Sequence, residues 1–87
     1  MPDAGRQSVR VLLFGAEAAA MGAASVSVAV ESGCTCEVLR ECLAGEHAAL
    51  RPFLKTARFA VNSEFAAPGR AVGPGDEVAL IGMVSGG

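Results

Sequence analysis

The chain has 87 residues, a formal net charge of −2 at pH 7 and a hydrophobic content of 52%. This length allows one small domain. Only 7 Lys and Arg residues are present and they form no cluster, which argues against a basic nucleic-acid-binding face. No apolar run approaches the roughly 20 residues needed to span a bilayer, and residues 1–10 hold no signal-peptide core. We therefore expect a cytoplasmic protein without nucleic-acid or membrane partners.

The first third of the chain predicts two strands joined through a short helix. Residues 9–14 (VRVLLF) form a compact apolar run typical of a buried strand. Residues 16–21 are rich in alanine and predict a short helix that is closed by Gly22. Residues 25–30 (SVSVAV) alternate small or polar residues with valine, which indicates a half-buried strand. The two strands suit a hairpin with an elaborated loop.

One well-marked amphipathic helix follows. Thr35 is a good N-cap, and Glu37 in the first turn favours the helix dipole. Apolar residues then recur at helical spacing, at Cys36, Leu39, Cys42 and Leu43. We expect Gly45 to weaken or end the helix, and residues 47–54 to form a looser turn that contains Pro52.

The three cysteines fall in one short window, at Cys34, Cys36 and Cys42. An odd number argues against a disulfide framework, and three are too few for an all-cysteine zinc or iron–sulfur site. His47, the only histidine, would complete a Cys₃His set, but the spacing lacks the C-x₂-C knuckle. We therefore expect no metal, with Cys36 and Cys42 buried, Cys34 the most accessible thiol, and His47 solvated at the helix end.

The last third of the chain predicts three more strands. Residues 57–61 (ARFAV) form one, and Asn62-Ser63 supplies the turn to a short partner at residues 64–66. Two turns rich in glycine and proline, at residues 68–69 and 73–76, lead to a last strand at residues 77–81.

This order of elements predicts an α+β two-layer domain. A helix clasped by a mixed sheet is the β-grasp (ubiquitin-like) arrangement, whose C-terminal strand usually lies centrally. We expect a β-grasp domain at residues 1–81 and a tail at residues 82–87. Six extended residues reach about 20 Å.

The chain ends in Val84-Ser85-Gly86-Gly87. A tail without Cβ atoms can thread a narrow channel, and its carboxylate can be activated in the ATP site of another enzyme. A frayed end is the alternative, because termini are often disordered and tolerate small residues.

Four segments resemble the β-grasp sulfur-carrier proteins, most closely the small subunit of molybdopterin synthase. They are VRVLLFG (residues 9–15) followed by Gly22, the helix that opens at Thr35, FAVNSEF (residues 59–65), and VGPGDEVALI (residues 72–81) running into VSGG. The last segment is the most specific, because its G-D-E precedes a strand that ends the chain in Gly-Gly.

The resemblance implies sulfur transfer in molybdenum cofactor biosynthesis. A partner similar to ubiquitin-activating enzymes would adenylate Gly87 with ATP, and a persulfide-derived sulfur would replace AMP to leave a C-terminal thiocarboxylate (1-thioglycine). The carrier would then dock on the large synthase subunit, in a heterotetramer, and donate sulfur to a cyclic pyranopterin precursor. The chain would not be catalytic alone and would bind no permanent cofactor, since its partner consumes the ATP.

The resemblance also implies roles for single residues. Gly87 would carry the reactive carbon, and Gly86 would let enzyme walls approach closely. Tail contacts would come from Met83, Val84 and Ser85, with Gly82-Met83 standing where the family often has a proline pair. An apolar docking surface has as candidates Phe14, Phe59, Phe65 and Leu80, each with core packing as the alternative.

Two other functions stay open. One is a sulfur carrier for thiamin thiazole, tRNA thiolation or cysteine synthesis. The other is a protein modifier conjugated through Gly87 to lysines, for which the single lysine of the chain, Lys55, disfavours polymeric chains. An autonomous enzyme is disfavoured, because one histidine allows few catalytic sets and no glycine-rich phosphate loop follows a strand.

Overall fold

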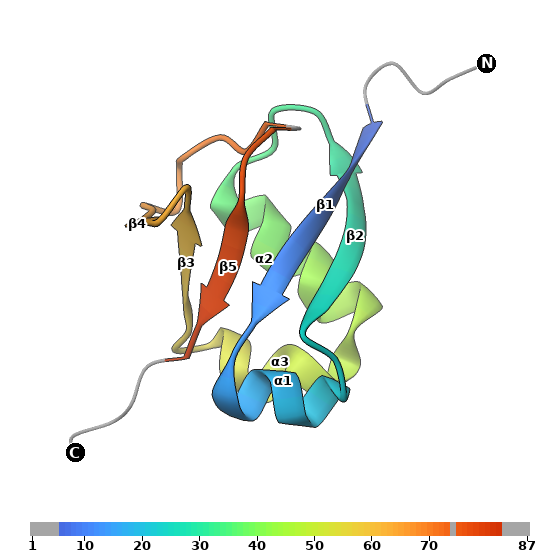
Figure 1. Cartoon of the computed structure of the whole chain (residues 1–87). Helices are drawn as coiled ribbons and strands as arrows, with labels where there is room; N and C mark the ends of the chain where they lie inside the picture. Colours follow the sequence, from blue (N-terminus) through green and yellow to red (C-terminus); the bar gives the residue numbers. More distant parts are fainter. Residues whose placement is uncertain (1–5, 74, 83–87) are drawn as a thin grey trace.

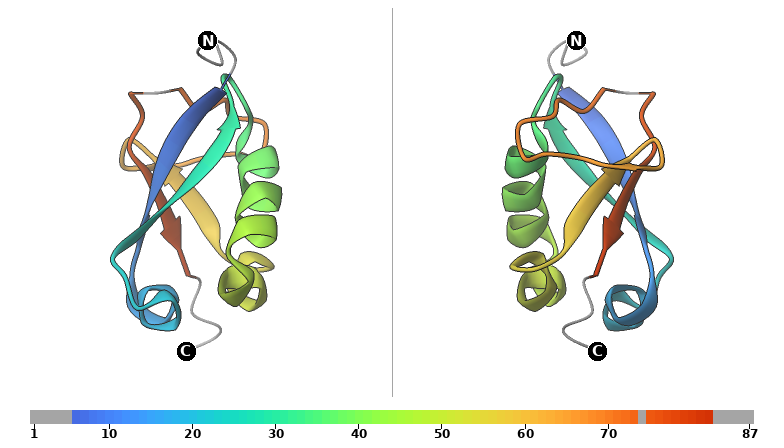
Figure 2. Two further views of the ribbon diagram at one scale, coloured as in Figure 1. Left: turned by 90° about the vertical axis from the view of Figure 1, so that its right-hand side faces the viewer. Right: turned by 90° about the vertical axis from the view of Figure 1, so that its left-hand side faces the viewer.

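A mixed sheet carries the long helix α2 (Cys36–Glu46) on one face, and α1 (Gly15–Met21) lies at the end of the sheet (Figures 1 and 2). The computed structural model of the chain describes residues 6–73 and 75–82, and within them the sheet has five strands in the order β2-β1-β5-β3-β4. The elements are β1 (Arg6–Leu13), α1 (Gly15–Met21), β2 (Ser25–Glu31), α2 (Cys36–Glu46), a 3₁₀ helix (Ala48–Leu50), α3 (Arg51–Leu54), β3 (Arg58–Val61), β4 (Glu64–Phe65) and β5 (Val78–Ile81). The predicted β-grasp fold is confirmed.

The N-terminal hairpin has the predicted elaborated loop. Strands β1 and β2 pair antiparallel, and the connection between them holds α1. This helix ends where Gly22 adopts φ 64°, a left-handed conformation that glycine takes without steric cost. The first strand begins at Arg6 rather than at residue 9, and Phe14 lies beyond its end as the N-cap of α1.

Strand β5 lies at the centre of the sheet. It runs parallel to β1 and antiparallel to β3, so that Ala79 is paired with Leu12 on one side and with Ala60 on the other. The turn from β3 to β4 contains Asn62 and Ser63 with φ values of 53° and 71°, as their turn chemistry predicts. Because β5 is parallel to β1, its C-terminal end points toward α1 (Figure 1).

The core lies between the sheet and α2. Alternate residues of the strands point inward and meet Leu39 and Leu43 of the helix, which are fully buried. Phe59 is 2% exposed and Leu80 is 0% exposed, so both belong to this core. Burial of each such side chain contributes about 1.5–3 kcal/mol. The interpretation of Phe59 and Leu80 as docking residues is therefore wrong, and the core alternative holds for both.

Helix α2 begins as predicted and ends later than predicted. The hydroxyl of Thr35 accepts a hydrogen bond from the Val38 N–H at 3.3 Å, which is the N-cap geometry. The helix continues through Gly45 to Glu46, and His47 follows as its C-cap. His47 is half-buried and its Nε2 lies 3.0 Å from the Ser27 carbonyl oxygen, so it ties the helix end to β2 instead of being simply solvated.

The predicted looser turn at residues 47–54 contains the 3₁₀ helix and α3, with Pro52 in the first turn of α3, where a missing N–H costs nothing. None of the helices in the described part of the chain is long and apolar enough to cross a membrane.

Candidate functional site

The described chain stops one residue beyond the central strand. Residues 83–87 lie outside the described part of the structure, and with them the predicted tail residues Met83, Val84, Ser85, Gly86 and Gly87. The structure does describe β5, the strand that leads to these residues. Leu80 is paired with Leu13 of β1 and with Phe59 of β3, so β5 is held along both edges before the tail begins.

An apolar patch covers the sheet face opposite α2. The inward positions of the strands are buried, and the alternating positions between them point to this outer face. Phe14 and Phe65 are 52% and 57% exposed there. We call this patch the apolar face; its residues surround a hollow of about 340 Å³ and are Leu12, Phe14, Ala60, Phe65, Ala79 and Ile81.

Charged residues border the apolar face. The Arg58 guanidinium carbon lies 4.8 Å from the centroid of the Phe65 ring, a cation–π distance that holds the ring against β3. Arg10, Glu64 and Glu77 are exposed on the same strands or next to them. An apolar centre with a polar rim of both signs is the usual anatomy of a protein–protein contact surface.

A second hollow adjoins the point where the tail begins. Its volume is about 420 Å³, and it shares Phe14 and Ile81 with the apolar face. Phe53 of α3 and Gly82 also line it, together with Glu17 of α1, which is 5% exposed. Among residues 6–73 and 75–82, Glu17 is the one charged side chain that is buried.

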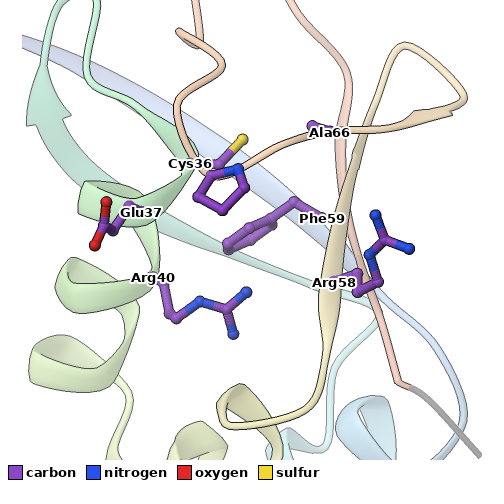
Figure 3. Close-up of a pocket in the computed structure, with 7 residues that line it drawn as sticks. Cys36, Glu37, Arg40, Arg58, Phe59 and Ala66 are labelled. Atoms are coloured by element: carbon purple, nitrogen blue, oxygen red, sulfur yellow. The ribbon is translucent and has the colours of Figure 1, made fainter.

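A third hollow, of about 260 Å³, lies between α2 and β3 (Figure 3). Arg40 reaches across it from the helix toward the Phe59 ring, with its guanidinium carbon 5.5 Å from the ring centroid. The same guanidinium donates hydrogen bonds to the carbonyl oxygens of Leu54, the last residue of α3, and of Ala57, just beyond it. Because both of its terminal nitrogens donate to the backbone, Arg40 fastens the end of α3 to α2.

Two of the three thiols, those of Cys34 and Cys42, differ from their predicted exposure. Cys36 is 2% exposed, as predicted, but Cys34 is also buried at 8%, while Cys42 is half-buried. Burial raises the pKa of the Cys34 and Cys36 thiols. The chain after β4 runs next to Cys34, with the Val72 N–H donating to the Cys34 carbonyl oxygen at 2.8 Å. The expectation that Cys34 is the most accessible thiol is wrong.

Within the described ranges, no three His, Cys, Asp or Glu residues gather as a metal site would require.

The loop before β5 is held by the side chains of Asn62 and Asp76. Asp76 accepts hydrogen bonds from the Gly73 N–H at 2.8 Å and from Asn62 Nδ2 at 2.9 Å. These bonds favour the charged form and hold the pKa of the Asp76 carboxyl below its usual value. The G-D-E segment thus fixes where β5 begins.

Several functional candidates were missed by reading the sequence. Leu12, Ala79 and Ile81 of the apolar face fall in runs with apolar neighbours on both sides, so their outward orientation had only the period-2 alternation as a signal. Glu17 gave no signal, because a glutamate in an alanine-rich helix usually faces solvent. Its burial depends on a contact with a residue far along the chain.

Comparison with known proteins agrees with this architecture. The sequence profile of the ThiS family matches residues 11–87. No curated protein matches the chain. The crystal structure of SAMP1 from Haloferax volcanii is similar with a TM-score of 0.77 and 35% identity, over 93% of this chain and 100% of that one. A crystal structure of the H. volcanii small archaeal modifier protein 1 gives a TM-score of 0.75 and 29% identity, over 88% and 98% of the two chains.

A more distant structural match is the complex of subunits 1 and 2 of the molybdopterin-converting factor from Helicobacter pylori. One of its chains gives a TM-score of 0.64 with 21% identity, over 93% of this chain and 100% of that one. At this identity the match shows a shared fold.

Proposed function

Because the chain belongs to the ThiS family, whose β-grasp fold is that of sulfur carriers and ubiquitin-like modifiers, we propose that it is the sulfur-carrier subunit of a molybdopterin synthase. The observation that carries the proposal is the central place of β5, which is paired with both β1 and β3 as far as Leu80 and with β3 through Ile81. A chain end that leaves the sheet from its centre follows a strand that has a hydrogen-bonded neighbour on each side.

The chemistry takes place at Gly87. A carboxylate oxygen of Gly87 attacks the α-phosphorus of ATP in a partner's active site, pyrophosphate leaves, and an acyl adenylate forms. A persulfide sulfur then attacks the acyl carbon and AMP leaves. A thiol cleaves the resulting sulfur–sulfur bond, which leaves the thiocarboxylate on Gly87 and a disulfide on the donor side. The partners supply the phosphate-binding and acid–base groups, and the small glycine at position 86 admits their walls.

The apolar face supports docking on such partners. Its two exposed phenylalanines, Phe14 and Phe65, line the same hollow as Ala79 and Ile81 of β5, so a partner bound there lies next to the strand that leads to the tail. The matching chain from H. pylori is in a complex with a second subunit of the molybdopterin-converting factor. We extend this arrangement to the present chain, with a large subunit that binds the apolar face, a heterotetramer as the complete enzyme, and a cyclic pyranopterin precursor as sulfur acceptor.

A second function is favoured by a different observation. The 35% identity to SAMP1 over the full length of that chain is higher than the 21% identity to the molybdopterin-converting factor chain. A modifier uses the same adenylation step and then transfers the Gly87 carbonyl to a lysine of a target. Carriers of the thiamin, tRNA thiolation and cysteine pathways share the thiocarboxylate chemistry and differ in the acceptor.

The deciding experiment is intact-mass analysis of the protein isolated from its own cells. A sulfur carrier shows an oxygen-to-sulfur mass gain localised to Gly87. For molybdopterin synthase, this gain is lost when the large subunit and the pyranopterin precursor are added. A protein present only as the free acid during active cofactor synthesis, while isopeptide adducts on target lysines accumulate, contradicts the carrier proposal and supports the modifier.

A further inference from the structure

Glu17 places a carboxylate in a buried site with apolar neighbours. Its side chain is 5% exposed, and it lies on α1 beside the apolar residues Phe14, Phe53 and Ile81. Transfer of a carboxylate out of water is unfavourable unless its surroundings compensate. A hydrophobic side chain of similar size would pack there without this cost, so the presence of a carboxylate calls for an explanation other than stability.

The carboxylate lies directly against Gly82. A Cβ atom placed on Gly82 would be 2.9 Å from Glu17 Cδ and from Oε1, and still closer to Oε2. These separations are shorter than real Cβ contacts, so the Glu17 carboxylate fills the space that a side chain at position 82 would need. Only glycine permits this contact.

Gly82 is the first residue beyond the paired part of the sheet. Ile81 is still paired with Arg58 of β3, whereas Gly82 lies after the end of β5. Glu17 belongs to α1, which lies in the connection between β1 and β2. It therefore contacts Gly82 from outside the sheet. It restrains the backbone at the one point where strand pairing ends and the tail begins.

We propose that Glu17 is a positioning residue that fixes the direction in which the reactive tail leaves the domain, by packing its carboxylate on Gly82. The inference rests on the proposed function, since it assigns the tail a destination in a partner's active site. A misdirected tail delivers its terminal carboxylate less often, and displacements of about 1 Å in a reacting group can cost up to 100-fold in rate. The contact acts through shape, so glutamine, which has the same shape, replaces glutamate.

Two different substitutions remove the same contact. Glu17→Ala deletes the carboxylate, and Gly82→Ala displaces it. The displaced group is the far end of a flexible side chain, and the adjoining hollow of about 420 Å³ gives it room, so the sheet need not move. Because each variant destroys one shared interaction, their effects should not add in the double variant. Matched controls are Gly69→Ala, where an added Cβ meets no atom within 4 Å, and Glu41→Ala on the exposed side of α2.

The assay follows ATP–pyrophosphate exchange by the cognate activating enzyme, with the carrier as the varied substrate. We expect Glu17→Ala and Gly82→Ala each to lower kcat about 5–20-fold with KM changed less than about twofold, because the docking surface is intact. The double variant should match the worse single variant, while Glu17→Gln and both controls stay within about threefold of the wild type. A merely structural role gives another pattern, since a smaller folded fraction of the carrier raises its apparent KM and leaves kcat unchanged.

The inference is overturned if Glu17→Ala keeps the wild-type kcat, if the two losses multiply in the double variant, or if Glu17→Gln falls as far as Glu17→Ala. Absence of exchange with the wild-type protein would instead refute the proposed function. The inference is then tested on the free protein by ¹⁵N relaxation. Glu17→Ala should increase backbone motion at Gly82 and not at the paired residue Ile81, and unchanged motion at Gly82 refutes the contact.

Discussion

Asn62 donates a hydrogen bond from its side-chain amide to the Asp76 carboxylate at 2.9 Å, and so joins the turn after β3 to the loop before β5. The same Asn62 side chain accepts a hydrogen bond from the Glu77 N–H at 2.9 Å through Oδ1. Asp76 in turn accepts from the Gly73 N–H at 2.8 Å. Two segments far apart in the sequence are thereby fixed where the central strand starts, and the strand delivers the tail at its other end.

The Asp76 network predicts a pH-dependent stability. The folded-state pKa of Asp76 lies below its usual value of 3.8, because the backbone N–H of Gly73 and the Asn62 amide favour the carboxylate. A depressed pKa stabilises the folded state above the unfolded pKa, and this contribution is lost as the pH falls through the folded pKa. We expect Asp76→Asn to be less stable than the wild type in urea denaturation at pH 7.

The difference between wild type and Asp76→Asn should shrink as the pH falls below 3.8, where the wild-type carboxylate takes up a proton. Glu64→Gln, at an exposed position of β4, is the control and should show no such dependence. An equal difference in unfolding free energy at neutral and at acid pH would contradict the role of the Asp76 charge.

Two phenylalanines near each other in sequence should respond in opposite ways to truncation. Phe65 is 57% exposed on the apolar face, whereas Phe59 is 2% exposed in the core. Phe65→Ala should weaken binding of the activating enzyme or the large subunit about tenfold or more, with a small change in unfolding free energy. Phe59→Ala should lower the unfolding free energy by about 3–5 kcal/mol.

The pair is measured by calorimetric titration with the partner and by urea denaturation of the free protein. Because both variants lose the same atoms, Phe59→Ala controls for loss of an aromatic side chain as such. Unchanged partner binding in the folded Phe65→Ala variant would remove the apolar face from the docking model.

Arg40 should resist conservative replacement. Its guanidinium donates to the carbonyl oxygens of Leu54 and Ala57 and lies over the Phe59 ring. A lysine cannot make this planar, forked arrangement, so we expect Arg40→Lys to lose about 1–3 kcal/mol of unfolding free energy. Arg51→Lys is the matched control, since the exposed Arg51 makes a single side-chain hydrogen bond within the described part of the chain, from Nε to the Ala44 carbonyl oxygen at 2.8 Å. Equal losses in the two variants would contradict the bidentate role.

The fold was predictable from the sequence because its signals are local. Thr35 and Gly22 mark helix ends by their own backbone chemistry, and Asn62-Ser63 marks a hairpin turn. The exposure of single side chains depends on contacts between distant segments. Cys34 is buried and hydrogen-bonded through its backbone to Val72, and nothing near Cys34 in the sequence indicates either.

The candidate site was only partly predictable, because the exposure of its residues also depends on contacts between distant segments. Phe14 was identified as a surface candidate, yet nothing local distinguishes it from Phe59 until the register of β3 against β5 is known. The contact between Glu17 and Gly82 joins the first connection of the fold to its last described residue. Such a contact exists only after the sheet has closed, so propensity and periodicity leave it undetermined.

The thiols should react in an order opposite to that expected from their place in the sequence. Cys34 and Cys36 are buried and their pKa values are raised, so their thiolate fraction at mildly alkaline pH is small. Cys42 is half-buried. Alkylation of the native protein followed by peptide mass mapping should modify Cys42 first. In Cys42→Ala, the remaining labelling should be slow and should accelerate in urea. Early modification of Cys34 would contradict the burial of its thiol.

The tail should tolerate substitution at Ser85 and not at Gly86. Both residues lie outside the described part of the structure, and the prediction follows from the proposed adenylation of Gly87 in a narrow channel. A methyl group at position 86 removes backbone angles that only glycine adopts and widens the chain next to the reacting carboxylate. We expect Gly86→Ala to lower kcat/KM for ATP–pyrophosphate exchange at least about tenfold, while Ser85→Ala stays close to the wild type. Because both residues come after β5 in the chain, we expect both variants to unfold in urea as the wild type does. If Gly86→Ala turns over at the wild-type rate, the channel does not select for glycine, and the Gly-Gly ending needs another explanation.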